Sequence, residues 1–146
     1  MKDTTNLLDY NPYSAGEYSN DLSGIYRTNA NHEIIISNEW SYIGETSFRI
    51  RSKSADATNF IINRASREIN SVLTLQANIK VIRGTIQLRL QEISTNLMTD
   101  VNIPAGSTGE FTVSRTISST QQVQATLLTR SADALFYIDN IRLTTR

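Results

Sequence analysis

The stretch Val72–Gln91 reads VLTLQANIKVIRGTIQLRLQ and decides the fold class of this chain. Over Leu75–Val81 the apolar residues occupy every second position, and polar residues occupy the positions between them. The same alternation resumes at Thr85, after a turn at Arg83-Gly84. A period of two is typical of a β-strand that buries one face. The stretch therefore predicts two strands joined by a turn.

The sequence LFYIDNIRL, which ends at Leu143, breaks its own alternation. Phe136 and Ile138 fall on one face of a regular strand, whereas Ile141 and Leu143 fall on the other. Either this strand is buried on both faces, or a bulge at Asp139-Asn140 resets the phase. A bulge would aim the aspartate carboxylate in a direction that a regular strand does not allow.

Strand patterns fill most of the remaining chain, and Gly, Pro, Asn and Ser cluster between them. The further strand-like segments are His32–Ser37, Ser47–Arg51, Phe111–Val113 and Val123–Leu127. A short helical turn is expected only near 65–69. Many short strands with almost no helix predict an all-β fold, an antiparallel β-sandwich of jelly-roll type with roughly eight to ten strands. Residues 1–146 are expected to form a single domain.

Composition excludes several classes of partner. The chain has 14 basic and 14 acidic residues, so its formal net charge is zero. Nucleic acids and anionic membrane surfaces require a basic field, so neither is expected as a partner. No apolar run is long enough for membrane insertion, and no signal-peptide core follows Met1. We expect an extracellular, cell-surface or virion location, as a module of a longer protein; a cytoplasmic protein is the alternative.

The polar positions of the alternating strands form a ladder of amides with one guanidinium and few carboxylates. If the strands stack in one sheet, the ladder contains Asn59, Asn63, Gln76, Asn78, Gln87, Arg89, Gln91, Gln122, Gln124 and Thr126. Such side chains can donate to and accept from neutral, hydroxyl-rich ligands without a charge to desolvate. The same ladder is also ordinary for the wet surface of a β-sheet, and the pattern by itself leaves both interpretations open.

Three segments occur in an order and spacing that is typical of one family. The first is Asn6–Leu8 followed by Asn11-Pro12, the second is Gly44–Ile50, and the third is Phe136–Ile141 with its Asp139. Together they resemble the jelly-roll carbohydrate-binding modules of the galactose-binding-like type, families 4, 9 and 22 among them. The resemblance covers nearly the whole chain. It implies non-catalytic binding of an oligo- or polysaccharide on the concave face of one sheet.

Carried over residue by residue, the resemblance names a set of binding residues. Trp40 and Tyr42 look like the aromatic residues of these modules, and the polar positions fall on the amide ladder. The predicted ligand-binding residues are Trp40, Tyr42, Asn63, Gln76, Asn78, Gln87, Arg89, Gln122 and Gln124. Trp40, the single Trp, serves equally well as a sugar platform or as a cap on the core at a sheet edge.

The resemblance also implies a structural calcium ion, although no cofactor is required for binding. In these modules the opening segment usually continues with Phe-Glu, and here Tyr13-Ser14 stands at that place. Asp139 and Glu17 are the carboxylates that remain as candidate ligands, because calcium binds six or more oxygens that usually include carboxylates.

Catalysis is not expected. No Gly-x-Ser-x-Gly elbow, phosphate-binding loop or cysteine is present, and the acidic residues are scattered. The rival interpretation is a structural or adhesive β-sandwich that mediates protein assembly, for example a homo-oligomer in a phage tail. Arg115, Arg130 and Arg142 are candidates for contact with anionic sugars, and nothing in the sequence selects among them.

Overall fold

The computed structural model describes residues 26–27, 32–52, 60–118, 122–131 and 133–146 of the chain. These residues contain ten strands and no helix. The strands are β1 (Tyr26–Arg27), β2 (His32–Ser37), β3 (Ser47–Ser52), β4 (Phe60–Ser66), β5 (Val72–Arg83), β6 (Ile86–Glu92), β7 (Leu97–Ile103), β8 (Thr108–Thr116), β9 (Gln122–Thr129) and β10 (Ala134–Thr145).

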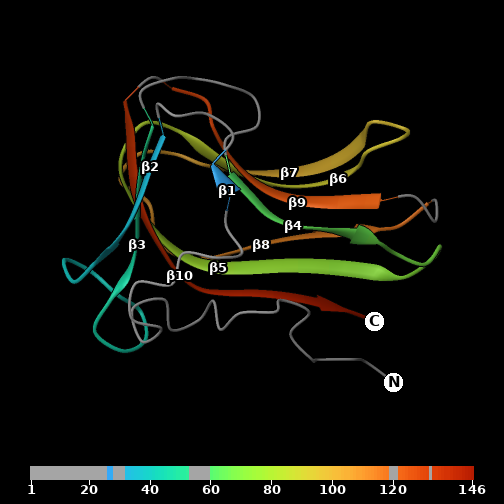
Figure 1. Cartoon of the computed structure of the whole chain (residues 1–146), viewed down its shortest axis with the longest axis horizontal. Coiled ribbons are helices and arrows are strands. Elements are labelled where there is room, and N and C mark those ends of the chain that lie inside the picture. Colours follow the sequence, from blue (N-terminus) through green and yellow to red (C-terminus); the bar gives the residue numbers. More distant parts are fainter. Residues whose placement is uncertain (1–25, 28–31, 53–59, 119–121, 132) are drawn as a thin grey trace.

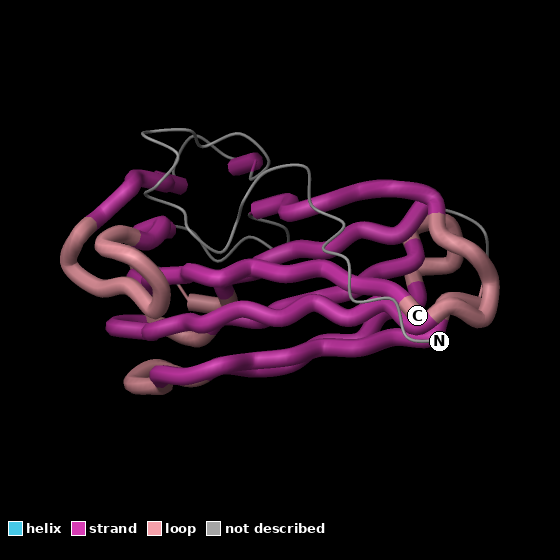
Figure 2. Tube along the Cα trace, turned by 90° about the horizontal axis from the view of Figure 1, so that it is seen from below, coloured by secondary structure: helices cyan, strands magenta, loops and turns pink. Residues whose placement is uncertain are grey.

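The strands form two antiparallel five-stranded sheets that face each other (Figure 1). One sheet has the order β1-β4-β9-β6-β7, and we name it the β9 sheet after its central strand. The other has the order β2-β3-β10-β5-β8 and is named the β10 sheet. The strands from β4 to β9 run along the length of the molecule, whereas β2 and β3 lie at one end and run across it (Figure 1 and Figure 2). The predicted antiparallel β-sandwich of jelly-roll type is thereby confirmed.

Alternation of apolar side chains builds the core between the sheets. In β5, Leu73, Leu75, Ala77 and Ile79 are at most 1% exposed, and Thr74 and Gln76, which alternate with them, lie on the outer face. Strands β6 and β9 supply the opposite wall through residues such as Leu88 and Leu127, which are fully buried. Each central strand thus places one polar row on the outer surface of its sheet.

A bulge in β10 resolves the broken alternation of the closing segment. Asp139 lies opposite Asn78 of β5, but the next pair is Arg142 with Gln76, so two residues of β10 face one of β5. Asn140, inside the bulge, has a φ of 53°, a left-handed conformation that Asn tolerates. As a result, the apolar residues before and after the bulge all face the core. These are Phe136, Ile138, Ile141 and Leu143, each 0% exposed.

The turn between β5 and β6 carries the chain from one sheet to the other. Gly84 has a φ of 80°, and a Cβ placed on it would lie 3.0 Å from the Cβ of Ala134. Its backbone therefore requires glycine on two grounds, conformation and space. Because β5 belongs to the β10 sheet and β6 to the β9 sheet, their outer rows lie on opposite sides of the molecule.

One local prediction is wrong. The expected helical turn near 65–69 is absent, because β4 continues to Ser66 and the following residues form a turn. Pairing with β9 explains this, since Ala65 and Ser66 lie opposite Val123 and Gln122.

Candidate functional site

A polar surface covers the outer side of the β9 sheet, and we call it the β9 polar face. Arg89 of β6 lies opposite Asp100 of β7 on one side and Thr126 of β9 on the other. Opposed residues of antiparallel strands share a face. The same registers bring together Arg64, Gln87, Arg89, Gln91, Asp100, Asn102, Gln122, Gln124 and Thr126. They also place three apolar residues on this side of the sheet, Ile61, Met98 and Leu128.

Hydrogen bonds orient the side chains at one side of this face. Arg89 donates from Nε to Oδ1 of Asp100 at 2.6 Å and from its terminal nitrogen to Oδ2 at 2.9 Å, which is a bidentate ion pair. Arg130 donates to Oε1 of Gln87 at 2.7 Å, and Gln87 in turn donates to Asn102. Amide and guanidinium groups are therefore held in fixed directions on the sheet.

The centre of the β9 polar face is buried although its residues are polar. Thr126, Gln124 and Arg89 are 1%, 6% and 7% exposed. The hydroxyl of Thr126 has no hydrogen-bond partner within the described part of the chain. A buried hydroxyl without a partner has lost its hydrogen bonds to water and gained none within the protein. Its burial therefore costs free energy unless another molecule bonds to it.

Five of the nine predicted binding residues lie elsewhere, two of them on β5. Gln76 and Asn78 belong to β5 and therefore to the β10 sheet, so the prediction that they share a face with Gln124 is wrong. Asn78 is also only 4% exposed, and its Oδ1 accepts a hydrogen bond from Asn140. Alternation along the sequence gives the face of a strand but not its sheet, and the turn at Gly84 changes sheets.

Asn63 is displaced by a second bulge. The register of β4 against β9 shifts between Ile61 and Asn63, so that Asn63 lies opposite the core residue Ala125. Arg64, which the sequence analysis did not select, takes the place opposite Gln124. Oδ1 of Asn63 accepts a hydrogen bond of 2.7 Å from Arg67.

Other residues of the face were missed because β7 was not recognised. Asp100 and Asn102 alternate with Val101 and Ile103, but the strand-like segment from 97 to 103 is weakly apolar. The alternation of polar Asp100 and Asn102 with apolar Val101 and Ile103 was the sequence signal that could have identified this strand.

The aromatic part of the predicted site lies on the β10 sheet. The backbone N–H groups of Tyr42 and Ile43, in the loop between β2 and β3, both donate to Oδ2 of Asp139 at 2.9 Å. Oδ1 of Asp139 accepts from the N–H of Asn140, also at 2.9 Å. Ser47 adds a hydrogen bond of 2.6 Å to the carbonyl of Trp40. The bulge thus aims the carboxylate at this loop and holds it against β10.

Trp40 packs beside β10. Its ring lies 6.3 Å, centroid to centroid, from the ring of Tyr137. The hydroxyl of Tyr137 donates to Glu39 at 2.8 Å, and Arg49 forms an ion pair with the same carboxylate at 3.0 Å. These two donors hold the pKa of Glu39 below its ordinary value, and burial together with the bond to Glu39 raises the pKa of Tyr137.

Tyr42 is 58% exposed and lies in the same loop, so the structure places the two predicted aromatic residues in one layer and the amides of β6 and β9 in the other. Of the predicted residues, only Gln87, Arg89, Gln122 and Gln124 come together on one face.

The described residues contain no group of three or more acidic or histidine side chains placed to hold a metal ion. Both oxygens of Asp139 accept backbone hydrogen bonds, and Glu17 lies outside the described residues. The calcium site stays a prediction. Within the same part of the chain, no helix has the length and apolar character needed to cross a membrane.

Comparison by sequence finds no match among protein-family models or curated proteins. Comparison of structures finds several. The chain superposes on the CBM22-1 xylan-binding domain of Paenibacillus barcinonensis Xyn10C with a TM-score of 0.66 and 12% identity, covering 99% of this chain and 97% of that one. TmCBM61 in complex with β-1,4-galactotriose gives a TM-score of 0.65 and 15% identity, covering 97% and 99%.

A third similar structure is the enzymatically active domain of tailspike protein 4 of bacteriophage CBA120. It has a TM-score of 0.70 and 14% identity, and the match covers 96% of this chain but 22% of that one. At these identities the likeness shows the fold, a jelly-roll β-sandwich shared with carbohydrate-binding modules. The resemblance predicted from the sequence is confirmed at that level.

Proposed function

We propose that this chain is a non-catalytic glycan-binding domain that holds a neutral saccharide chain on the β9 polar face. The observation that carries the proposal is the buried hydroxyl of Thr126, which has no partner within the described residues and lies opposite Arg89. A sugar hydroxyl can both donate and accept, so it supplies the bond that Thr126 lacks. Because Thr126 is 1% exposed, binding also requires the groups that cover this side chain to move aside. Gln124 and Arg89 offer an amide and a guanidinium on either side of it.

The fold supports the same function. Two similar structures are described as a xylan-binding domain and as a module in complex with a galactotriose. We infer that this chain likewise serves as a module of an extracellular enzyme or of a virion protein. Affinity for each sugar unit is expected to be modest, because every sugar hydroxyl gives up water when it binds.

The test is isothermal titration calorimetry with xylan, β-1,4-galactan and β-glucan oligosaccharides. We expect saturable binding of one neutral class. Thr126→Val should weaken that binding about fivefold, since one net hydrogen bond is worth about 1 kcal/mol. The variant should retain its stability, because the hydroxyl has no partner within the described residues.

Thr116→Val is the matched control, since Thr116 is exposed at the end of β8 in the other sheet. Equal affinity of Thr126→Val and the wild type would contradict the proposed face. Chromatography of the titrated oligosaccharide checks the absence of catalysis, and any shortening of the chain would contradict a non-catalytic role.

A further inference from the structure

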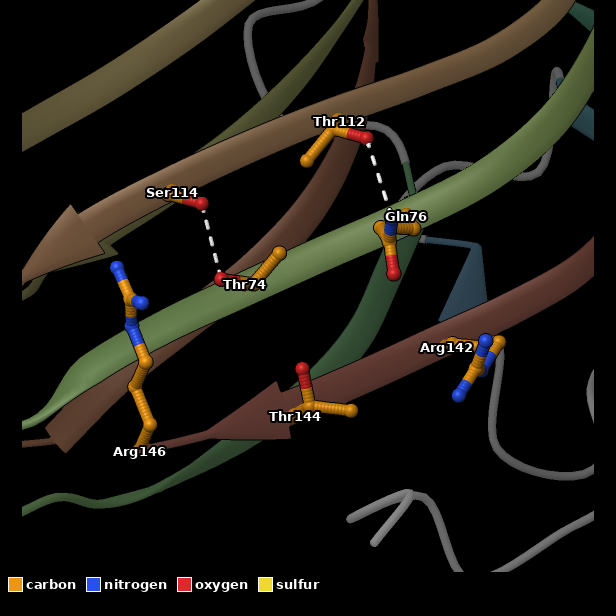
Figure 3. Close-up of a pocket in the computed structure, with 7 residues that line it drawn as sticks. All are labelled: Thr74, Gln76, Thr112, Ser114, Arg142, Thr144 and Arg146. Atoms are coloured by element: carbon orange, nitrogen blue, oxygen red, sulfur yellow. Dashed lines mark hydrogen bonds between the residues drawn. The ribbon is translucent and has the colours of Figure 1, made fainter. Parts of the chain in front are cut away.

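A polar hollow lies on the side of the molecule opposite the β9 polar face, on the outer face of the β10 sheet (Figure 3). It spans β10, β5 and β8 on the C-terminal side of the β10 bulge and has a volume of about 420 Å³. We call it the β10 groove. Its lining residues are Thr74, Gln76, Thr112, Ser114, Arg142, Thr144 and Arg146.

Every lining side chain is polar, and several retain unused donors. The hydroxyls of Thr74 and Ser114 lie 2.9 Å apart, and Gln76 donates to Thr112 at 3.4 Å. A pair of hydroxyls joined by one hydrogen bond keeps one O–H free to donate. The row of hydroxyls can therefore bond to a ligand without losing its internal bonds.

The two arginines that line this groove have no carboxylate partner among the described residues. Elsewhere, five arginines form ion pairs with carboxylates at 2.6 to 3.4 Å: Arg49, Arg51, Arg83, Arg89 and Arg115. Arg142 and Arg146 have no such partner within the described residues, and neither do Arg64, Arg67 and Arg130, which lie outside the groove. No described Asp or Glu lines the groove. Among the residues that the structure describes, the groove thus has two guanidinium groups and no acid to neutralise them.

The two guanidinium groups do not converge on one point. Arg142 and Arg146 are four residues apart, which places their Cα atoms about 13 Å apart in an extended chain. In Figure 3 the side chain of Arg146 extends toward Ser114, whereas that of Arg142 lies at the other end of the groove beside Gln76. This arrangement suits a ligand with repeated anionic groups better than a single small anion.

We propose that the β10 groove is a second binding site, separate from the β9 polar face, for a polyuronate, a saccharide chain whose sugar units carry carboxylates. Guanidinium binds a planar carboxylate through two parallel hydrogen bonds. The hydroxyls and the amide of Gln76 bind sugar hydroxyls between the two carboxylates. A peptide would find no apolar anchor in this lining, and a nucleic acid would find no aromatic side chain on which to stack its bases.

The experiment is calorimetry at low ionic strength with tetragalacturonate and, as its neutral counterpart, galactotetraose. The wild type should bind the acidic chain at least about tenfold more tightly, and added salt should weaken this binding. The double variant Arg142→Gln/Arg146→Gln should lose about tenfold in affinity, as expected for two exposed charge contacts.

Lys80→Gln/Arg83→Gln is the matched control, because it removes two positive charges from β5 of the same sheet but outside the groove. An equal loss of affinity for tetragalacturonate in this control would show that net charge alone explains the effect, and it would overturn the proposed site. Equal affinity for the neutral tetramer, or unchanged affinity of the Arg142/Arg146 double variant, would also overturn it. Tighter binding of a sulfated chain would overturn the choice of carboxylate.

The neutral-glycan site on the β9 polar face and the polyuronate site in the β10 groove can be tested independently. Thr126→Val should leave tetragalacturonate binding unchanged, and the Arg142/Arg146 double variant should leave binding of the neutral glycan unchanged. Loss of both ligands in either single-site variant would show that the two sites are one and would overturn the second site.

Discussion

The two halves of β10, before and after the bulge, differ in whether their outward polar side chains are bonded within the protein. Before the bulge, Tyr137 and Asp139 are at most 5% exposed and bond to the loop that carries Glu39 and Tyr42. After the bulge, the outward residues Arg142 and Thr144 line an open groove. A single inserted residue separates a segment whose polar groups are satisfied within the fold from one whose polar groups face outward.

This difference indicates which polar side chains are available to bind a ligand. Polar side chains that are already paired inside the protein contribute to stability, and they must break bonds before they bind a ligand. Those left with free donors or charges contribute little to stability and are available. Four substitutions or pairs of substitutions in and around β10 test this division.

Asp139→Asn should have the largest effect. The substituted amide keeps the shape but replaces one carboxylate oxygen by a donor, which faces backbone N–H groups that need an acceptor. Because the site is buried, we expect a loss of about 3 kcal/mol in the free energy of unfolding. Urea denaturation measures it. A loss below about 0.5 kcal/mol would remove Asp139 from its anchoring role.

Asn140→Ala should cost about 2 kcal/mol, since it forces alanine into the left-handed conformation and removes the hydrogen bond to Asn78. Asn140→Gly keeps the backbone conformation available and removes only that bond, so it should cost about 1 kcal/mol. The difference between the two variants, again by urea denaturation, isolates the conformational part. Equal costs would mean that the bulge does not depend on a left-handed residue.

The paired half should be sensitive to acid. The pKa of Glu39 is lowered in the folded state, so its contribution to stability is present above its ordinary value of 4.5 and is lost as the pH falls through the lowered folded value. Melting temperatures of the wild type and Glu39→Gln should therefore differ at neutral pH and converge in acid. A constant difference across this range would contradict the assignment.

Substitutions in the half of β10 after the bulge should change the stability of the protein very little. Arg142→Gln/Arg146→Gln removes charges that have no ion-pair partner within the described residues, so the free energy of unfolding should change by less than about 0.5 kcal/mol. Differential scanning calorimetry checks this result. A large loss of stability would mean that these arginines have a structural role and that the two halves of β10 do not differ in this way.

The sequence predicts the fold class because burial of one face imposes a period of two, and β5 and β6 follow it closely. It also reduces the closing strand to two alternatives. The conflict in phase between Ile138 and Ile141 requires a bulge or burial on both faces, and Asn140 in a left-handed conformation decides for the bulge.

Assembly of the site is harder to predict, because it depends on contacts between distant residues. Whether a turn such as Gly84 stays within a sheet or crosses to the other depends on tertiary packing. The bulge in β4 gives no signal, since Ile61 and Ile62 are both apolar. Likewise, the bond from Tyr42 to Asp139 joins residues 97 positions apart.

Trp40 is an intrinsic fluorescence probe of this protein. As the single tryptophan, with its ring 6.3 Å from that of Tyr137, it receives excitation energy from that tyrosine and reports whether the loop between β2 and β3 is docked. It belongs to the layer opposite the β9 polar face. Steady emission during a titration with neutral sugar is therefore the expected signal of an occupied, intact molecule, and a spectral shift would instead report the loosening of one end of the β10 sheet.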